Sequence, residues 1–216
     1  MWISAVVCVA GFVYRAFALY RLTRPKEVVL CPVTVQKERP APSISEEERK
    51  LDRIARFQNT MLGRHPVMII VSTVFHVSLF AAPLLLMAHN QMLRRAIGIG
   101  LPSMPDGLAD LMTVLVLGCA VFFLVRRIAV PKVAAISYAV DYGVLFLTVM
   151  PFLTGFLAYH QLFDYKSVIT LHALTGDLLL IALPFTKVGH MVFFFFSRLT
   201  IGSEFSTGRG SRTWST

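Results

Sequence analysis

The sequence predicts an all-α membrane protein with five transmembrane helices, an outside N-terminus and a cytoplasmic C-terminus. Of its 216 residues, 56% are hydrophobic and only 15% are charged, and the mean hydropathy is +0.66. A soluble domain of this size carries about 25% charged residues. The apolar residues also fall in blocks of roughly 20, the length that crosses a bilayer as a helix. Composition therefore excludes a disordered chain, a collagen and an ordinary cytosolic enzyme.

Five apolar blocks are long enough to span a membrane. The spans are expected at about Trp2–Tyr20, Val67–Ala88, Leu108–Val125, Val133–Ala158 and Val168–Phe196. The first block is interrupted by Arg15. It lacks the basic start and small-residue cleavage site of a secretion signal, so we expect it to stay in the mature protein. The spans form one domain over residues 1–200, and residues 201–216 form a cytoplasmic tail.

The basic residues predict the orientation, because Lys and Arg concentrate on the cytoplasmic side of membrane proteins. Ten of them lie between Arg21 and Arg64, after the first span. Three more follow the third span, and three follow the fifth span: Arg198, Arg209 and Arg212. The opposite side holds Arg94, Arg95 and Lys166. This asymmetry also accounts for the net charge of +9 without nucleic-acid binding.

The loop over residues 21–64 contains one predicted amphipathic helix, at about residues 45–62. Ser45 followed by Glu48 is typical of a helix N-terminus, in which the two side chains cap each other's backbone. Leu51, Ile54 and Ala55 then form an apolar stripe. The helix is expected to lie on the membrane surface or to dock a cytoplasmic subunit.

Cysteine offers little chemistry in this chain. The three cysteines are far apart and form no CxxC pair, which disfavours disulfide, zinc and iron–sulfur sites. The sequence has no CxxCH motif, so no covalent c-type haem is expected.

Histidine is the informative residue, because ionisable groups at membrane depth are costly and by default indicate function. His76 lies in the second span, and His172 and His190 lie in the fifth. The last two are 18 residues apart, a whole number of turns at about 100° per residue. A continuous helix would present both to one neighbour, roughly 27 Å apart along its axis.

Two antiparallel helices that each supply a histidine can hold a b-type haem through its two axial positions. Antiparallel order pairs His76 with His190, and His89 with His172. His76 and His89 point in directions that differ by about 140° on an ideal helix. Pro83 lies between them and can bend the helix.

A second pairing scheme stays open because His65 lies 11 residues before His76 and points nearly the same way. The pairs would then be His65 with His190, and His76 with His172.

Several motifs resemble the gamma subunit of respiratory nitrate reductase. The last helix carries the most specific one: Leu171-His172-x-x-x-Gly176, then Pro184-Phe185-Thr186-Lys187-x-x-His190. Two further matches are Phe75-His76-Val77 and Arg126-Arg127-x-x-x-Pro131-Lys132-Val133, followed by Asp141. The resemblance covers about 150 residues.

The resemblance implies a five-helix, dihaem cytochrome b that exchanges electrons with quinone. It implies that His76 and His190 ligate the haem nearer the cytoplasm, and that His172 ligates the distal one. The chain departs from the family at Leu86, where the family has its second histidine of this helix. His89, one turn later, is our substitute; otherwise the distal haem is five-coordinate, differently ligated or absent.

The Pro-Phe-Thr-Lys-x-x-His form and the Gly/Arg-rich tail resemble more closely the membrane cytochromes of heterodisulfide-reductase-like complexes and of sulfate reducers' transmembrane redox complexes. The resemblance implies haem b, menaquinone, a cytoplasmic iron–sulfur subunit and also a periplasmic multihaem cytochrome c as partner. It implies a bacterial or archaeal inner membrane and a role in the electron transport of anaerobic respiration.

Proton transfer at a quinone site has three candidate residues: Asp177, His160 and Lys166. Asp177 is a carboxylate inside the fifth span, where it could relay protons or face a haem propionate. His160 and Lys166 lie in a short outer loop that could bind a quinol head group. Asp141 is expected to pair with Arg126, Arg127 or Lys132.

Two other classes of function remain. The chain could be a haem-free membrane anchor or assembly subunit of a redox complex. It could also be a small transporter or proton channel that uses His172 and Asp177.

Overall fold

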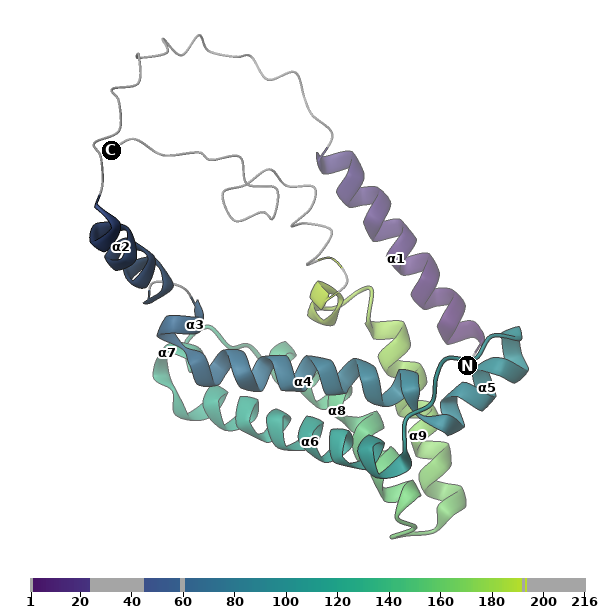
Figure 1. The fold of residues 1–216 in the computed structure, drawn as a ribbon. Helices are drawn as coiled ribbons and strands as arrows, with labels where there is room; N and C mark the ends of the chain where they lie inside the picture. The colour runs from purple at the N-terminus through teal and green to yellow at the C-terminus, as the bar shows by residue number, and fades with distance from the viewer. Residues whose placement is uncertain (1, 24–44, 59–60, 192, 194–216) are drawn as a thin grey trace.

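The computed structural model describes residues 2–23, 45–58, 61–191 and 193, and every regular element in these ranges is helical (Figure 1). The long helices are α1 (Trp2–Thr23), α4 (Pro66–Leu85), α6 (Asp106–Ala129), α8 (Ala139–Tyr159) and α9 (Tyr165–Ala182). The shorter ones are α2 (Glu46–Gln58), α3 (Met61–Arg64), α5 (Met87–Ile97), α7 (Pro131–Ala134) and the 3₁₀ helix η1 (Lys187–Gly189).

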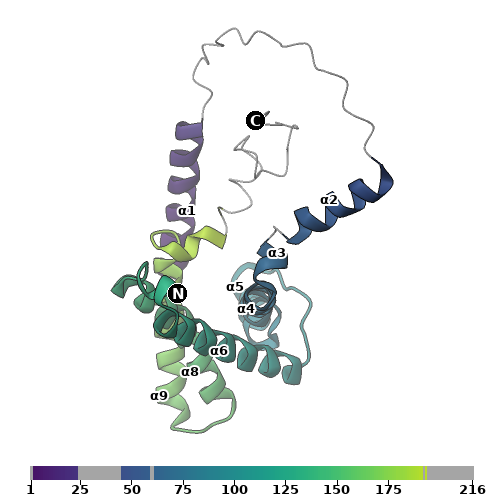
Figure 2. The ribbon, with the colours of Figure 1, turned by 90° about the vertical axis from the view of Figure 1, so that its left-hand side faces the viewer.

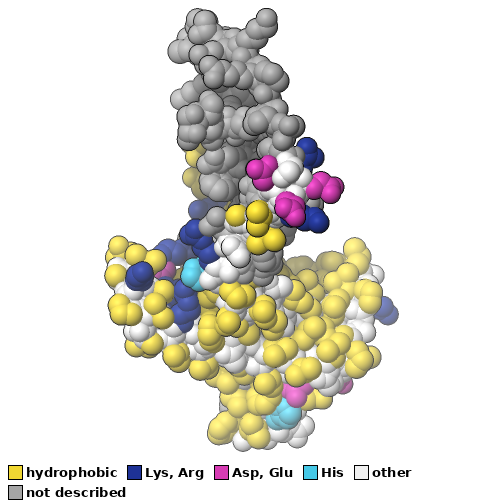
Figure 3. Space-filling view, turned by 60° about the vertical axis from the view of Figure 1, so that its left-hand side comes forward, with side chains coloured by type: hydrophobic (Ala, Val, Ile, Leu, Met, Phe, Trp, Pro, Cys, Tyr) yellow, Lys and Arg dark blue, Asp and Glu magenta, His cyan; other side chains and the backbone are white. Residues whose placement is uncertain are grey.

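Four of the described helices are long and apolar enough to cross a membrane: Trp2–Leu22, Pro66–Leu85, Asp106–Ala129 and Ala139–Tyr159. Large apolar side chains on these helices are exposed, as expected where lipid is the solvent, and Figure 3 shows them covering most of one face of the helical body. Most charged side chains in this view lie above that surface or along its edges (Figure 3). This part of the prediction, an all-helical chain with several membrane helices, is confirmed.

Neighbouring helices pack in the order α4, α6, α8, α9, α1 (Figures 1 and 2). The buried core lies where the first three meet, around Phe75, Leu79, Val116 and Ala120. Phe75 packs edge-on against Phe123 of α6, with ring centroids 5.2 Å apart. This order leaves α4 and α9 at separate places in the row, so contacts between them depend on long side chains.

The predicted second span, about Val67–Ala88, is confirmed as α4 to within three residues, but the helix ends at Leu85 and the chain breaks at Leu86. Its ψ of 131° is extended, and it ends α4 and begins α5. Pro83 removes a backbone donor just before the break, which weakens the last turn of α4. The segment then continues as α5, which ends at Gly98 with φ of 76°, a conformation that glycine adopts without strain.

The predicted fifth helix is also wrong in extent. α9 ends at Ala182, and a turn with Pro184 follows before η1. Thr186 has an extended backbone, and its hydroxyl accepts a hydrogen bond from the Val188 N–H, which caps the new helical segment. His172 and His190 therefore do not share one continuous helix. Residues 194–196 of the predicted span lie outside the described residues, as do the tail at 201–216 and residues 24–44 of the predicted loop.

The predicted helix at 45–62 appears as α2 and α3. The capping pair is confirmed: the Ser45 N–H donates to Glu48, and the Glu48 N–H donates to Ser45 Oγ at 3.3 Å. Leu51 and Ile54 of the apolar stripe are 66% and 53% exposed. Figure 2 shows α2 adjoining α3 and standing away from the long helices.

Candidate functional site

Two pairs of histidines come together across the row of helices. His76 on α4 faces His190, which follows η1; their ring centroids are 5.9 Å apart and the planes are at 88°. His89 on α5 faces His172 on α9, with centroids also 5.9 Å apart and planes at 15°. The structure thus forms the first of the two pairing schemes. The structure does not form the scheme with His65: His190 faces His76, and His65 lines a separate pocket at the start of α4.

The ring separation suits a shared metal ion. Two imidazoles bonded to one metal at about 2.0–2.1 Å each place their centroids roughly 6 Å apart. Aromatic pairs in direct contact also occur at about 4.5–7 Å, so separation alone does not distinguish the two arrangements. The hydrogen bonds of the rings distinguish them better.

All four rings make the same hydrogen bond, from Nδ1 to a backbone carbonyl. The partners are Ser72 for His76 (2.6 Å), Pro83 for His89 (2.9 Å), Pro151 for His172 (2.9 Å) and Lys187 for His190 (2.6 Å). A carbonyl only accepts, so Nδ1 carries the proton and the neutral ring keeps a lone pair on Nε2. Metal-ligating histidines are oriented in this way.

The other two histidines lack this pattern. His160, at the end of α8, uses Nε2 to contact Asp110 Oδ1 at 2.9 Å. His65 is exposed at the start of α4, and its side chain caps no backbone group there. Within the described part of the chain, the four paired histidines therefore form a distinct set.

The break at Leu86 places His89. The break interrupts the helix and leaves backbone carbonyls free. The Pro83 carbonyl accepts a hydrogen bond from His89 Nδ1, and the Leu85 carbonyl accepts one from the Met104 N–H at 2.9 Å. Asn90 is buried and holds the returning loop through Leu101 and Ser103. The break thus removes the mismatch of about 140° that one ideal helix would impose on His76 and His89.

Two cations from the chain hold the turn before His190. Arg15 of α1 donates to the Pro184 carbonyl at 2.8 Å, and its guanidinium lies 5.6 Å from the Phe193 ring. The Lys187 Nζ donates a hydrogen bond to Asp141 Oδ1 at 2.6 Å, and the Lys187 backbone carbonyl accepts one from His190 Nδ1. These contacts tie His190 to α1 and α8.

Asp141 has one of its predicted partners and one unpredicted partner. Arg127 lies 3.5 Å from Asp141 Oδ2, while Lys187 replaces Arg126 and Lys132 as the closer cation. Asp141 is buried and also accepts the Tyr138 N–H at the start of α8. Its role in the described contacts is therefore to join α6, α8 and the His190 turn.

His172 sits close against α8. A Cβ on Gly155 would lie 3.1 Å from His172 Cε1, so any larger residue would push the ring or the helix by a few tenths of an ångström. Thr154 is 1% exposed, and its hydroxyl lies 3.3 Å from both His172 Nδ1 and Thr175 Oγ1. These contacts limit the ring to one orientation.

The three predicted quinone or proton residues do not form one cluster. Asp177 bonds to Ser4 of α1, and it lies about 16 Å of helix rise beyond Lys166. His160 pairs with Asp110, which the sequence reading missed. Next to Lys166, Asp164 caps α9; hydrogen bonds from Ser167 hold the pKa of this carboxyl below its usual value.

Sequence reasoning also missed several residues that support the histidines: Arg15, Asn90, Thr154 and Gly155. Arg15 carried a usable signal, because a cation inside an apolar block needs a partner. Gly155 carried none, since glycine is common in membrane helices.

The donor set fits haem. Each pair offers two neutral imidazole nitrogens, which match the two axial positions of a b-type haem, whose porphyrin supplies the remaining four ligands. Among the described residues, no group of three or more His, Cys, Asp or Glu could hold a bare metal ion. Each pair therefore supplies the number and kind of axial donors that a b-type haem takes.

Comparison with known proteins gives one relative and no assigned activity. The chain is 37% identical over 150 residues to a protein of Nitratidesulfovibrio vulgaris (strain Hildenborough) that is named only "Protein". The match covers 69% of this chain and 66% of the relative, so the chain spans slightly less than two thirds of that protein. No family model and no solved structure matches the chain.

Proposed function

We propose that the chain is a haem b-containing membrane subunit that passes electrons between membrane quinone and a partner redox protein. The observation that carries this proposal is the repeated histidine arrangement: two pairs, each 5.9 Å apart, with Nδ1 of every ring bonded to a carbonyl. His76 and His190 would hold one haem, and His89 and His172 the other. Haem supplies reversible one-electron chemistry when it is bound.

The chain's own residues orient the ligands. The hydrogen bonds that each Nδ1–H donates to a backbone carbonyl raise the basicity of the ligand nitrogen and fix each ring. His76, His89 and His172 are half-buried and His190 is exposed, and solvent exposure is one of the levers that set a haem's potential.

The proposed site of proton transfer from quinol lies where α8 ends and where α6 and α9 begin. His160 and Asp110 form a contact of 2.9 Å there, and Lys166 lies in the first turn of α9. A histidine paired with a carboxylate can accept a proton from a quinol, and the nearby lysine favours the anionic form of the head group. Asp177, which is bonded to Ser4, has no place in this step.

The proposed setting is a respiratory complex in a bacterial or archaeal cytoplasmic membrane, with the N-terminus outside. The quinone is proposed to be menaquinone. The proposed partners are a cytoplasmic iron–sulfur subunit and a periplasmic multihaem cytochrome c. These assignments rest on the sequence resemblance and on the asymmetry of basic residues.

The test is the haem content of the purified full-length chain. We expect a b-type reduced-minus-oxidised spectrum and about two haems per polypeptide, one for each histidine pair. His76→Ala and His89→Ala should each retain about one haem, and the double variant about none. His65→Ala and His160→Ala are matched controls and should retain both.

Three outcomes would change the proposal. A folded preparation without a b-type band would favour a haem-free anchor subunit. Haem loss in His65→Ala would restore the other pairing scheme. Unchanged haem content in His89→Ala would remove the second pair as a haem site.

A further inference from the structure

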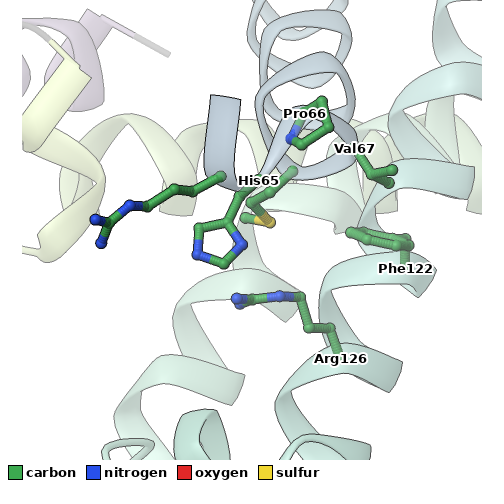
Figure 4. A pocket seen from close by; sticks show the side chains of 7 residues that line it. His65, Pro66, Val67, Phe122 and Arg126 are labelled. Carbon is green, nitrogen blue, oxygen red and sulfur yellow. The ribbon is translucent and has the colours of Figure 1, made fainter. Parts of the chain in front are cut away.

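A basic pocket lies at the end of the helical body where α4 begins and α6 ends (Figure 4). It has a volume of about 280 Å³, and its lining residues are Arg64, His65, Pro66, Val67, Met68, Phe122 and Arg126. Two candidate spans end here, α4 at Pro66 and α6 at Ala129. The pocket therefore lies where the hydrocarbon of a membrane gives way to the head-group layer.

Its polar lining is entirely basic. Arg64, His65 and Arg126 line it, and no acidic residue does. Figure 4 shows the His65 ring and the Arg126 side chain facing one another across the pocket. The neighbouring Arg127 behaves differently: it points to Asp141, Ser137 and Tyr142. Among the described residues no carboxylate pairs with Arg126 in this way, so its charge is available to the pocket.

The start of α4 adds to the positive field. His65 occupies the cap position, but its side chain makes no capping hydrogen bond. Backbone N–H groups in the first turn of a long helix favour an anion. Together with the guanidinium of Arg126, a group that binds phosphate through paired hydrogen bonds, they select a phosphate oxygen over a neutral head group.

The other half of the pocket is apolar. Val67, Met68 and Phe122 line it, and it continues onto exposed Ile70, 59% exposed on α4, and Val125, 56% exposed on α6. A free inorganic anion would use only the basic half. A phospholipid uses both, with its phosphate at the arginines and its acyl chain along the two helices.

We propose that the basic pocket binds the head group of an anionic phospholipid. The volume lies near the lower limit of about 300–1,000 Å³ typical of small-molecule sites, which suits a head group with the first atoms of its chains. Basic pockets between membrane helices bind anionic lipid head groups in this way. The bound lipid would join the start of α4 to the end of α6, the two helices that supply most of the buried core.

The test compares lipid binding by the full-length chain purified in detergent. Native mass spectrometry would count bound dioleoylphosphatidylglycerol against dioleoylphosphatidylcholine, and inorganic phosphate would be added as a competitor. We expect the wild type to prefer phosphatidylglycerol by about tenfold, and Arg126→Gln to lose most of that preference. Arg126→Lys should retain part of it, since a lysine keeps the charge but not the paired geometry.

Arg95→Gln, at the end of α5, is the matched control and should bind like the wild type. Equal binding of the two lipids, or an unchanged preference in both Arg126→Gln and Arg64→Gln, would overturn the proposal. Complete competition by millimolar inorganic phosphate would overturn the lipid assignment and leave a free-anion site. The site is independent of haem, so its failure would leave the proposed function untouched.

Discussion

One hydrogen bond separates the four paired histidines from the other two. In each paired ring, Nδ1 meets a carbonyl of the backbone. In His160, the contact is made by Nε2, and it goes to a carboxylate. Identical side chains therefore have different chemistry, because the hydrogen-bond partner near each ring decides which nitrogen keeps its lone pair.

Gly155→Ala tests how tightly His172 is held. The added Cβ would lie 3.1 Å from His172 Cε1, which forces the ring or the helix to shift. Overpacking of this kind lowers the free energy of unfolding by about 1–3 kcal/mol. Changing a residue that orients a metal ligand lowers the metal affinity by about 10–100-fold. We expect the haem content to fall from about two to about one per polypeptide, measured by pyridine haemochrome absorbance.

Gly143→Ala is the matched control on the same helix, because a Cβ there meets no atom within 4 Å. It should keep the haem content of the wild type. Equal haem content in both variants would show that close approach at Gly155 is not needed for ligand placement.

At the scale of elements, the two interruptions of predicted helices carry the site. The break at Leu86 turns His89 toward His172, and the turn after Ala182 brings His190 to His76. A proline lies near each interruption, Pro83 in the first and Pro184 in the second. Each interruption frees backbone carbonyls, and ring or side-chain donors satisfy them, as buried carbonyls require.

Arg15→Met tests the link between α1 and the His190 turn. It removes the donor of the 2.8 Å hydrogen bond to the Pro184 carbonyl. Pro184 is almost fully buried, so water cannot easily replace that donor. An unsatisfied buried carbonyl costs about 1–3 kcal/mol. We expect loss of the haem that we propose at His76 and His190, together with a shift in the midpoint potential of the haem that remains bound there.

Removing a charge from an apolar span makes membrane insertion easier, so poor insertion would not account for such a loss. Arg21→Met, in the last turn of the same helix beside Phe17, is the control and should keep both haems. Arg15→Lys should restore part of the potential if hydrogen bonding to the turn is the cause. A wild-type potential in Arg15→Met would contradict the positioning role.

For the whole molecule, the open question of greatest consequence is orientation, which the basic residues predict as N-terminus outside. Gly107→Cys and Glu47→Cys, each in a chain with Cys8, Cys31 and Cys119 changed to Ser, place a thiol at opposite ends of the helical body. Both positions are exposed, and a Cβ at Gly107 meets no atom within 4 Å. A membrane-impermeant maleimide should label Gly107→Cys in intact spheroplasts, and Glu47→Cys only after permeabilisation.

The reverse labelling pattern would invert the topology and place the His160–Asp110 end in the cytoplasm. Labelling of both thiols in intact spheroplasts would show that the segment between residues 47 and 107 does not cross the membrane as proposed.

The sequence by itself determined the helical membrane class, the approximate positions of four spans, the Ser45 cap and the histidines worth pairing. Hydropathy and helical periodicity are local properties, so a linear reading captures them. It could not determine the bounds of the second and fifth helices, since Pro83 and Pro184 permit a break without specifying where the chain turns.

Only the tertiary structure decided which histidines meet and which atoms hold them. Arg15 reaches Pro184 across 169 positions of sequence, and His172 approaches Gly155 across a helix pair. Such contacts depend on the relative placement of helices. That placement follows from how side chains of distant segments pack, which no single segment encodes.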